Sequence, residues 1–383
     1  MTALPPPAGA RPAAARGKLP CVQCLRRSWL VARLAGHIEL AWSARRGSAA
    51  LLALDDEQLI AALGGAEREA IAAEHARFEA CVLLRRCAAC HLVPLCRCDA
   101  RYPAPLHDLA DAPAVLYLHG APERLARACA GGRVAIVGAR RATPYGLEQA
   151  RALGRGIAAS GLTVVSGMAL GVDAAAHVGA LEADGLTIAV LACGPERAYP
   201  SSKRRLHARI AAAGAVVAEL PPGTPARRWC FPARNRIIAA LAQATVVVEA
   251  GKRSGSLITA GQAAELGREV AAVPGLVTAP LAAGTNALIA DGARLVRGSR
   301  DVLELLFGAE AAAELAAEDD AAATRELAPD LLTLLEQIGG GCDTPAALAA
   351  GPDELDAVLA GLAQLELRGL VRRGLGGRYT ASA

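Results

Sequence analysis

The feature that most constrains the fold is a repeated alternation of short apolar runs and helical patterns between residues 134 and 273. Runs such as Val134–Val137 and Thr245–Val248 indicate buried parallel strands, and helical segments lie between them. The other expected strands cover residues 115–118, 162–165, 187–191, 216–219 and 270–273. Repeating βα units of this length predict an α/β fold, an extended Rossmann-like, doubly wound parallel sheet with helices on both faces.

Glycine-bearing loops follow the carboxyl ends of the expected strands, where ligands bind in open α/β sheets. The turn Gly251–Ser256 contains two basic residues and opens a helical pattern, so its free N–H groups and the helix dipole favour phosphate. An ordinary βα turn with solvated basic residues is the alternative. The residues expected to converge at this edge of the sheet are Arg140, Ser166, Gly167, Gly171, Arg234, Ser254, Gly255 and Ser256.

The familiar nucleotide motifs are incomplete in this chain. Gly138–Arg141 lacks the G-x-G-x-x-G triple, and Ser166–Asp173 lacks the Lys-Ser/Thr pair of a P-loop. Asp173, His177 and Glu249 could serve as acid or base groups. However, His177 lies one helical turn past Asp173, which favours capping or packing, and Glu249 ends a buried strand beside basic residues. We therefore expect a binding protein and not an enzyme.

Length and charge set further limits. A chain of 383 residues favours two or three domains, and a net charge of +4 is too small to indicate a nucleic-acid partner by itself. No apolar run is long enough to span a bilayer, so we expect a cytoplasmic protein with no membrane partner. The expected parts are a disordered tail at 1–18, a helical, Cys-rich N-terminal domain at 19–100, the Rossmann-like domain at 101–308, a linker at 309–326 and a winged-helix domain at 327–383.

Cysteines are concentrated near the N-terminus, where 7 of the 11 precede residue 99. In a reducing compartment, clustered cysteines indicate a metal before a disulfide. Two pairs separated by a helical insert can form a tetrahedral zinc site, although the separation is wider than in common zinc fingers. Reduced thiols in a small helical domain are the alternative, and we expect no required cofactor. The preferred zinc ligands are Cys21, Cys24, Cys96 and Cys98, with Cys87 and Cys90 as alternates.

The C-terminal segment from residue 327 has three helical patterns followed by a hairpin around Gly374–Gly377, which is the winged-helix pattern. Winged helices usually bind duplex DNA. The third helix contains Asp353, Glu354, Asp356 and Glu366 against a lone Arg368, and this acidity disfavours a DNA groove. A contact with another protein is therefore the favoured role.

From about residue 102 onward, the chain resembles the bacterial DprA family of DNA-processing proteins, also called Smf. The motifs that carry the resemblance occur in order and are specific. They are VAIVGARRATPYG at 134–146, SGMALGVDAAAH at 166–177, Tyr199-Pro200, ELPPGTP at 219–225, FPARNRIIAAL at 231–241, SGSLITA at 254–260, GREVAAVPG at 267–275 and GTNALIADGA at 284–293.

The resemblance implies a cytoplasmic, homodimeric protein that binds single-stranded DNA without catalysis. It further implies that the protein protects incoming DNA during natural transformation and loads the RecA recombinase. Arginines and backbone amides bind phosphates, and an aromatic ring can stack on any base. Phe231 is the candidate for such a ring, and a ring packed in the core is the equal alternative. The family's strand-binding pocket maps onto Arg140, Phe231, Arg234, Asn235 and Arg236, with Lys203 and Lys252 as looser candidates.

The chain differs from the family pattern at two places, and two other functions are alternatives to single-strand binding. The family more often has Ser or Thr at Ala139 and Gly-Leu-Ser at 240–242, both small changes. A nucleotide-hydrolysing Rossmann enzyme is one alternative, but that group has P-G-G-x-G-T-x-x-E where this chain has Ser254–Thr259. A regulator that binds duplex DNA through the winged helix is the other.

Overall fold

Strand β3 (Arg133–Val137), whose five residues are all buried, lies in the interior of the sheet in the computed structural model of this chain. The structure describes residues 19–43, 51–310, 327–349, 351, 354–367 and 370–381. The expected tail at 1–18 and residues 311–326 of the expected linker lie outside the described residues. The chain divides into two compact units, 1–311 and 312–383, and each is described by itself.

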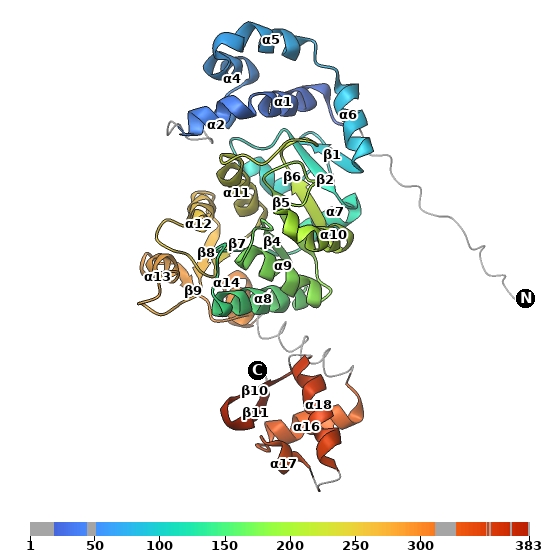
Figure 1. Cartoon of the computed structure of the whole chain (residues 1–383), viewed down its shortest axis with the longest axis vertical. Coiled ribbons are helices and arrows are strands. Elements are labelled where there is room, and N and C mark those ends of the chain that lie inside the picture. The colour runs from blue at the N-terminus through green and yellow to red at the C-terminus, as the bar shows by residue number, and fades with distance from the viewer. Residues whose placement is uncertain are drawn as a thin grey trace, which may run out of the picture. The chain divides into compact units, whose positions relative to one another are not determined.

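The other strands of the larger unit are β1 (Leu92–Cys96), β2 (Val115–His119), β4 (Thr163–Ser166), β5 (Thr187–Leu191), β6 (Ala215–Ala218), β7 (Ala244–Val247), β8 (Glu269–Ala272) and β9 (Arg294–Leu295). Within the described residues they form one sheet in the order β1-β2-β6-β5-β4-β3-β7-β8-β9 (Figure 1). Pairing is parallel from β6 to β9 and antiparallel for β1 with β2 and for β2 with β6. The predicted α/β fold with a mostly parallel central sheet is confirmed.

The order of the strands reverses at β3. The chain steps from β3 through β4 and β5 to β6 on one side, then returns to place β7, β8 and β9 on the other. The loops that leave β3 and β7 therefore diverge at the carboxyl ends of adjacent strands. Such a reversal opens a crevice in doubly wound sheets, and ligands bind there.

The helices of the larger unit are α1 (Val22–Arg33), α2 (Ala35–Ser43), α4 (Asp56–Leu63), α5 (Arg68–Ala76), α6 (Ala80–Ala89), α7 (Pro122–Ala130), α8 (Pro144–Ala159), α9 (Val172–Glu182), α10 (Arg204–Ala213), α11 (Cys230–Leu241), α12 (Gly255–Glu265), α13 (Ala283–Ala290) and α14 (Ser299–Phe307). Short 3₁₀ turns cover Gly65–Glu67, Ala104–Asp108 and Ser201–Lys203. Among the described residues, no helix combines the length and the apolar character that a membrane crossing requires.

Helices cover both faces of the parallel sheet. Ile188 and Val190 of β5 belong to the apolar cluster that includes Ile237 of α11. Their neighbours Ala189 and Leu191 belong to a different cluster, together with residues of α9 and α10. Because successive strand residues point to opposite faces, α11 packs on one face and α9 and α10 on the other.

Side-chain caps start α8 and α12, the helices that follow β3 and β7 in the chain. Thr143 precedes α8, and its hydroxyl accepts a hydrogen bond from the backbone N–H of Gly146 at 3.1 Å. Pro144 then occupies the first helical turn, where its missing N–H costs nothing. Ser254 caps α12, and its hydroxyl accepts from the N–H of Ser256 at 3.4 Å. Both helices therefore begin where their polar sequences predict.

The N-terminal helices pack against the sheet and against the start of α11. The indole N–H of Trp229 donates to the carbonyl of Ala35 at 3.0 Å. On the sheet side, the hydroxyls of Ser28 and Tyr117 are 2.8 Å apart and both are buried. The helical region and the sheet thus share their cores within the larger unit.

Strand β1 lies before residue 100, where the sequence predicts the start of the Rossmann-like domain. The sheet therefore begins earlier than predicted. Pro94 occupies the middle of β1, opposite Tyr117 of β2. Proline lacks the N–H of a ladder bond, so it is tolerated in an edge strand such as this one and weakens the sequence signal for a strand.

In the smaller unit, the described residues form α16 (Pro329–Gly339), α17 (Pro345–Leu348), α18 (Leu355–Leu367) and the antiparallel strands β10 (Val371–Arg373) and β11 (Tyr379–Ala381). Leu331, Leu362 and Val371 are among the buried residues of a separate core. Three helices followed by a hairpin is the succession that the sequence predicts. Its assignment as a winged helix stays a prediction.

Candidate nucleic-acid interface

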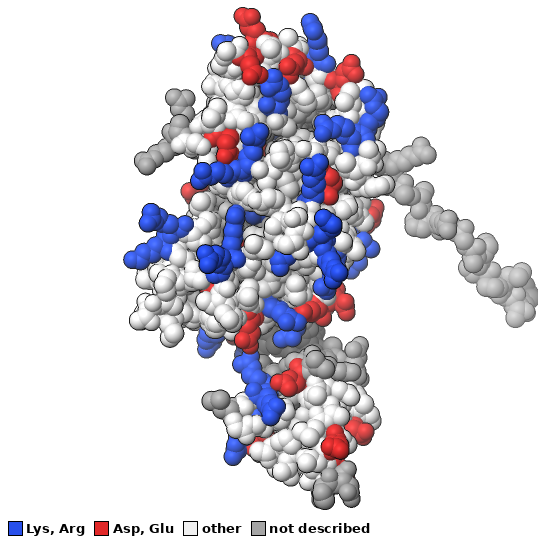
Figure 2. All heavy atoms as spheres, in the orientation of Figure 1, with Lys and Arg blue, Asp and Glu red and all other residues white. Residues whose placement is uncertain are grey.

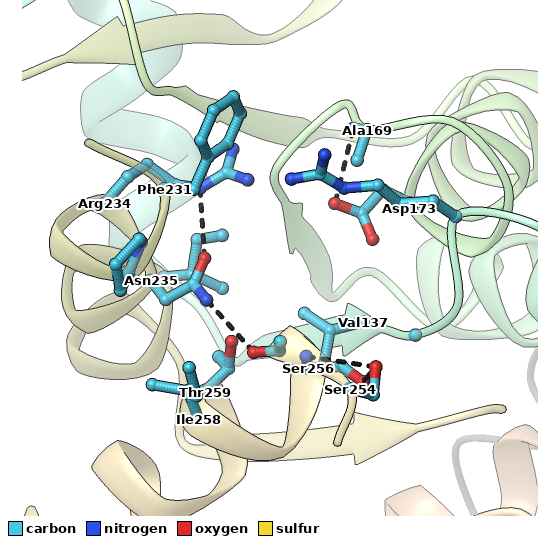
Figure 3. Close-up of a pocket in the computed structure, with 15 residues that line it drawn as sticks. Val137, Ala169, Asp173, Phe231, Arg234, Asn235, Ser254, Ser256, Ile258 and Thr259 are labelled. Carbon is cyan, nitrogen blue, oxygen red and sulfur yellow. Dashed lines mark hydrogen bonds between the residues drawn. The ribbon is translucent and has the colours of Figure 1, made fainter. Parts of the chain in front are cut away.

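A cavity of about 320 Å³ lies at the carboxyl ends of β4, β3 and β7, at the reversal of strand order (Figure 3). Its walls come from the loops after these strands and from α9, α11 and α12. Segments far apart in sequence meet here because the sheet brings their strands side by side. The predicted DNA-binding residues that line the cavity are Arg140, Phe231, Arg234, Asn235, Ser254, Gly255 and Ser256.

Arg234 of α11 is a buried arginine, 6% exposed, in the wall of the cavity. Its Nη1 donates to the carbonyl of Gly167 at 2.6 Å and also to the carbonyl of Val190. Its Nε donates to Oδ1 of Asn235 at 3.3 Å. Burial lowers the pKa of Arg234 to about 10, so the guanidinium stays protonated at neutral pH. The structure thus holds a fixed positive charge at this wall.

Gly167 supports the cavity without lining it. A Cβ at this position would lie 2.2 Å from Nη1 of Arg234, so a side chain there would displace the guanidinium. The N–H groups of Gly167 and Ala169 donate to Oδ2 of Asp173 at 3.1 and 3.4 Å. Burial raises the pKa of Asp173, and the carboxyl group shapes the loop after β4. Figure 3 shows Asp173 and Arg234 on opposite sides of the cavity.

A cation and two aromatic rings lie together beside the cavity. Cζ of Arg140, an exposed residue, is 4.7 Å from the ring centroid of Phe231. The ring of Tyr199 lies 5.5 Å from the Phe231 ring, centroid to centroid, at an angle of 51°. Phe231 is only partly buried, although it also packs against the core of the N-terminal helices. Phe231 is therefore in part a core ring, and its stacking on a base stays a prediction.

Tyr199 was not among the predicted site residues. It is 44% exposed and contacts the Phe231 ring. The signal that could have found it is the Tyr199-Pro200 pair, which is one of the motifs that carry the family resemblance. Its place near Phe231 depends on the fold, because 32 positions of sequence separate the two residues.

The floor of the cavity contains the start of α12 (Figure 3). The hydroxyls of Ser254 and Ser256 are 2.8 Å apart. Nδ2 of Asn235 donates to the carbonyl of Gly255 at 3.3 Å and so ties α11 to this helix start. The first N–H groups of an 11-residue helix carry partial positive charge, which favours an anion at this point.

Four further predicted residues lie away from the cavity lining. Ser166 is fully buried, and its hydroxyl donates to the carbonyl of Ile136 at 2.6 Å. Lys203 ends the 3₁₀ turn before α10, and Lys252 is exposed in the turn after β7. Neither lysine lines the cavity.

Arg236 is the fourth, and its placement argues against the predicted DNA contact. Its side chain is 4% exposed, and its guanidinium pairs with Asp111 at 2.7 Å and with Glu219 at 2.9 Å. Burial alone would lower the pKa of Arg236, but the two carboxylates raise it. The side chain therefore links α11 to the segments around residues 111 and 219, away from the cavity.

The remaining acid or base candidates have structural partners. Nδ1 of His177 lies 2.7 Å from Oγ1 of Thr187, and burial lowers the pKa of His177 to about 3. Glu249 accepts from the N–H of Thr143 at 2.9 Å and also from its hydroxyl. Both residues thus have the packing and capping roles that the sequence favours. Among the described lining residues, Asp173 is the one carboxylate, and it accepts hydrogen bonds from two backbone N–H groups.

Basic side chains surround this region on the visible face. In Figure 2 they predominate over acidic ones across the part of the larger unit where α9, α11 and α12 lie in Figure 1. The cavity lining itself contains two arginines and one aspartate. Guanidinium groups, a helix start and an exposed ring together can hold a phosphate next to a flat, apolar group.

Comparisons with known proteins found similar proteins over the region that contains the cavity. The family model described as DNA recombination-mediator protein A matches residues 94–307, which include every residue of the cavity lining. A DprA relative from Mycobacterium tuberculosis is 43% identical over 262 residues, which are 67% of this chain and 66% of the relative. The matched segment thus spans just under two thirds of that relative.

Two solved structures are also similar. The X-ray structure of DNA processing protein A from Streptococcus pneumoniae has a TM-score of 0.59 and 31% identity, over 74% of this chain and 95% of that one. A structure of DNA processing protein A from Helicobacter pylori has a TM-score of 0.51 and 29% identity, over 56% of this chain and 95% of that one. The latter concerns a single-stranded DNA binding mode of the Helicobacter protein.

Proposed function

Because this chain belongs to the DNA recombination-mediator protein A family, known as DprA or Smf, we propose that it binds single-stranded DNA across the cavity between α11 and α12. In this proposal the chain acts as a homodimer in the cytoplasm, protects incoming DNA and loads RecA recombinase onto it. Its task is binding and transfer, without bond-breaking chemistry. Family membership supports the RecA, dimer and transformation parts of the proposal.

One observation supports the DNA part most directly, namely the position of Arg140 over the ring of Phe231 at 4.7 Å. A guanidinium can contact a phosphate while the neighbouring ring stacks on the adjoining base. Such stacking is indifferent to base identity, since every base has a π-face. The pair therefore suits a polynucleotide of any sequence.

The same pair favours single strands over duplexes. A base reaches a protein ring only when it is unpaired and unstacked from its neighbours, which costs a few kcal/mol per base in a duplex. The N–H groups at the start of α12 and the charge of Arg234 offer further places for phosphates along the same cavity. A flexible strand can bend into a cavity of about 320 Å³, whereas a stiff duplex cannot follow such a bend at low cost.

The test is a titration of labelled single-stranded and double-stranded oligonucleotides at two or more salt concentrations. We expect tighter binding to the single strand. The variant Arg140→Ala should bind more weakly, and the slope of log K against log salt should fall by about one unit. The matched control is Arg300→Ala on α14, which removes the same charge from an exposed i,i+4 pair with Glu304.

Each other outcome has a defined meaning. Equal losses in the Arg140 and Arg300 variants would show a diffuse charge effect and contradict the proposed site. Equal affinity for duplex and single strand would favour the regulator that acts through residues 327–381. Turnover of a nucleoside monophosphate that disappears in Asp173→Asn would favour the hydrolase.

A further inference from the structure

Two cysteine pairs that lie far apart in sequence meet at the edge of the larger unit. Cys21 precedes α1 and Cys24 lies in its first turn, while Cys96 ends β1 and Cys98 lies in the following turn. Their four Sγ atoms all lie within 4.8 Å of one another. The Sγ of Cys98 is 4.0 Å from that of Cys21 and 3.9 Å from that of Cys24, across 77 and 74 positions of sequence.

These separations fit a tetrahedral metal site. Zinc–sulfur bonds of about 2.3 Å in a tetrahedron place the sulfur atoms about 3.8 Å apart. A disulfide needs two sulfurs about 2.05 Å apart, and all four cysteines are free thiols. The arrangement therefore resembles four ligands around one centre more than two bonded pairs.

Electrostatics points the same way. Four thiol groups this close together can all lose their protons only when a cation lies between them, because four thiolates without one would repel one another strongly. The N–H of Cys24 already donates to the Sγ of Cys21 at 3.5 Å, an outer contact of the kind that orients a thiolate ligand. Cys24 and Cys96 are buried, whereas Cys98 is exposed, so an ion can reach the centre from solution.

The alternates Cys87 and Cys90 lie outside this group of four, although both pack in the same apolar cluster as Cys24 and Cys96. Cys81 is exposed and lies outside the group and the cluster. Four cysteines with no position left for water match a closed, structural site and not a catalytic one.

We propose that Cys21, Cys24, Cys96 and Cys98 bind one zinc ion that fastens the N-terminal helices to the edge of the sheet. The ion joins the start of α1 to the end of β1 and so closes a loop of more than 70 positions. Without it, α1 is held by its apolar contacts and by hydrogen bonds such as the one between Ser28 and Tyr117. The site is independent of DNA binding, because none of its ligands lines the cavity.

The test uses the full chain, purified without chelators or added metal, and measures bound metals by mass spectrometry. We expect about one zinc per chain and, after removal and replacement by Co²⁺, the visible absorption of tetrahedral cobalt thiolate. Stripping the zinc from the wild type should lower its melting temperature. Cys98→Ser changes an exposed ligand, so it should fold and retain at least tenfold less zinc in competition with a chelator.

Matched controls separate this site from other thiols. Cys81→Ser and Cys90→Ser should keep zinc and the cobalt spectrum of the wild type. Should Cys98→Ser fail to fold, Cys98→His keeps four ligands and should bind cobalt with a shifted spectrum. The proposal is overturned if the wild type contains no zinc and gives no cobalt thiolate absorption. It is equally overturned by iron in place of zinc, by a disulfide within the four, by zinc loss in Cys90→Ser, or by full zinc retention in Cys98→Ser.

Discussion

Nη1 of Arg234 and the carbonyl oxygen of Gly167 are 2.6 Å apart, and this hydrogen bond joins α11 to the loop after β4. The arginine is thereby fixed before any ligand arrives, so little side-chain entropy remains to be lost on binding. Because Gly167 has no side chain, the guanidinium occupies the space where a Cβ would stand. The charge at this wall of the cavity thus depends on a glycine 67 positions away.

The first prediction concerns this contact. Gly167→Ala would place a Cβ 2.2 Å from Nη1 of Arg234 and so displace the guanidinium, with no change in formal charge. We expect roughly a tenfold loss of affinity for single-stranded DNA, about 1.4 kcal/mol, measured by fluorescence anisotropy. The control is Gly261→Ala on α12, where a Cβ meets nothing within 4 Å. Unchanged affinity in both variants would contradict a role for Arg234 in binding.

The second prediction concerns stacking on Phe231. Phe231→Leu keeps an apolar side chain but removes the ring beneath Arg140, and we expect a loss of about 1–3 kcal/mol in binding of single strands. The salt slope should not change, because no cation is removed. Phe307→Leu on α14, at a ring that is 45% exposed and outside the cavity lining, is the control. A reduced salt slope in the Phe231 variant would show that the ring acts through charge instead.

The third prediction assigns Arg236 to stability. Arg236→Met leaves the carboxylates of Asp111 and Glu219 without their buried partner. We therefore expect the free energy of unfolding, measured by urea titration, to fall by about 3–5 kcal/mol. Arg300→Ala, which breaks an exposed pair, should cost less than about 1 kcal/mol. Neutralising the partners as well, with Asp111→Asn and Glu219→Gln, should recover part of the loss. If Arg236→Met has near-normal stability but binds DNA more weakly, the result would instead support the DNA contact of Arg236 predicted from the sequence.

The fourth prediction concerns pH. Burial lowers the pKa of His177 from 6.5 to about 3 in the folded chain. Between pH 3 and pH 6.5, His177 therefore binds a proton in the unfolded chain but not in the folded chain. The contribution of His177 to stability is therefore complete above about pH 6.5 and is lost as the pH falls toward 3. His177→Gln should flatten the loss of stability in this window. NMR should show a neutral His177 ring at pH 5, and a ring that titrates near 6.5 would refute the prediction.

Strands were predictable wherever the sheet is buried on both faces. The runs around β3 and β7 are apolar and rich in β-branched residues, because helices cover both of their sides. β1 and β9 were missed because edge strands do not need such runs. β1 contains Pro94, and β9 has two residues, both exposed.

The site was predictable at the level of loops but not of single side chains. The βα repeat predicts that the loops of Arg140 and Ser254 lie at the same edge of the sheet, and the strand order then brings them together. Arg234 and Arg236 look equivalent in sequence, yet residues two apart on a helix do not share a face. Only the positions of Asp111 and Glu219 reveal that Arg236 points away from the cavity. Contacts of this kind are set by the tertiary fold and leave no local pattern.

Pro94 in β1 has a consequence for how copies of this chain can meet. A terminal strand with a free row of N–H and C=O groups invites a neighbour to continue the sheet. Proline interrupts that row at the middle of a five-residue strand, and the opposite margin ends in a strand of two residues. Among the described residues, neither margin of this nine-stranded sheet offers a long template for strand addition, which limits the growth of the larger unit into fibres through its sheet.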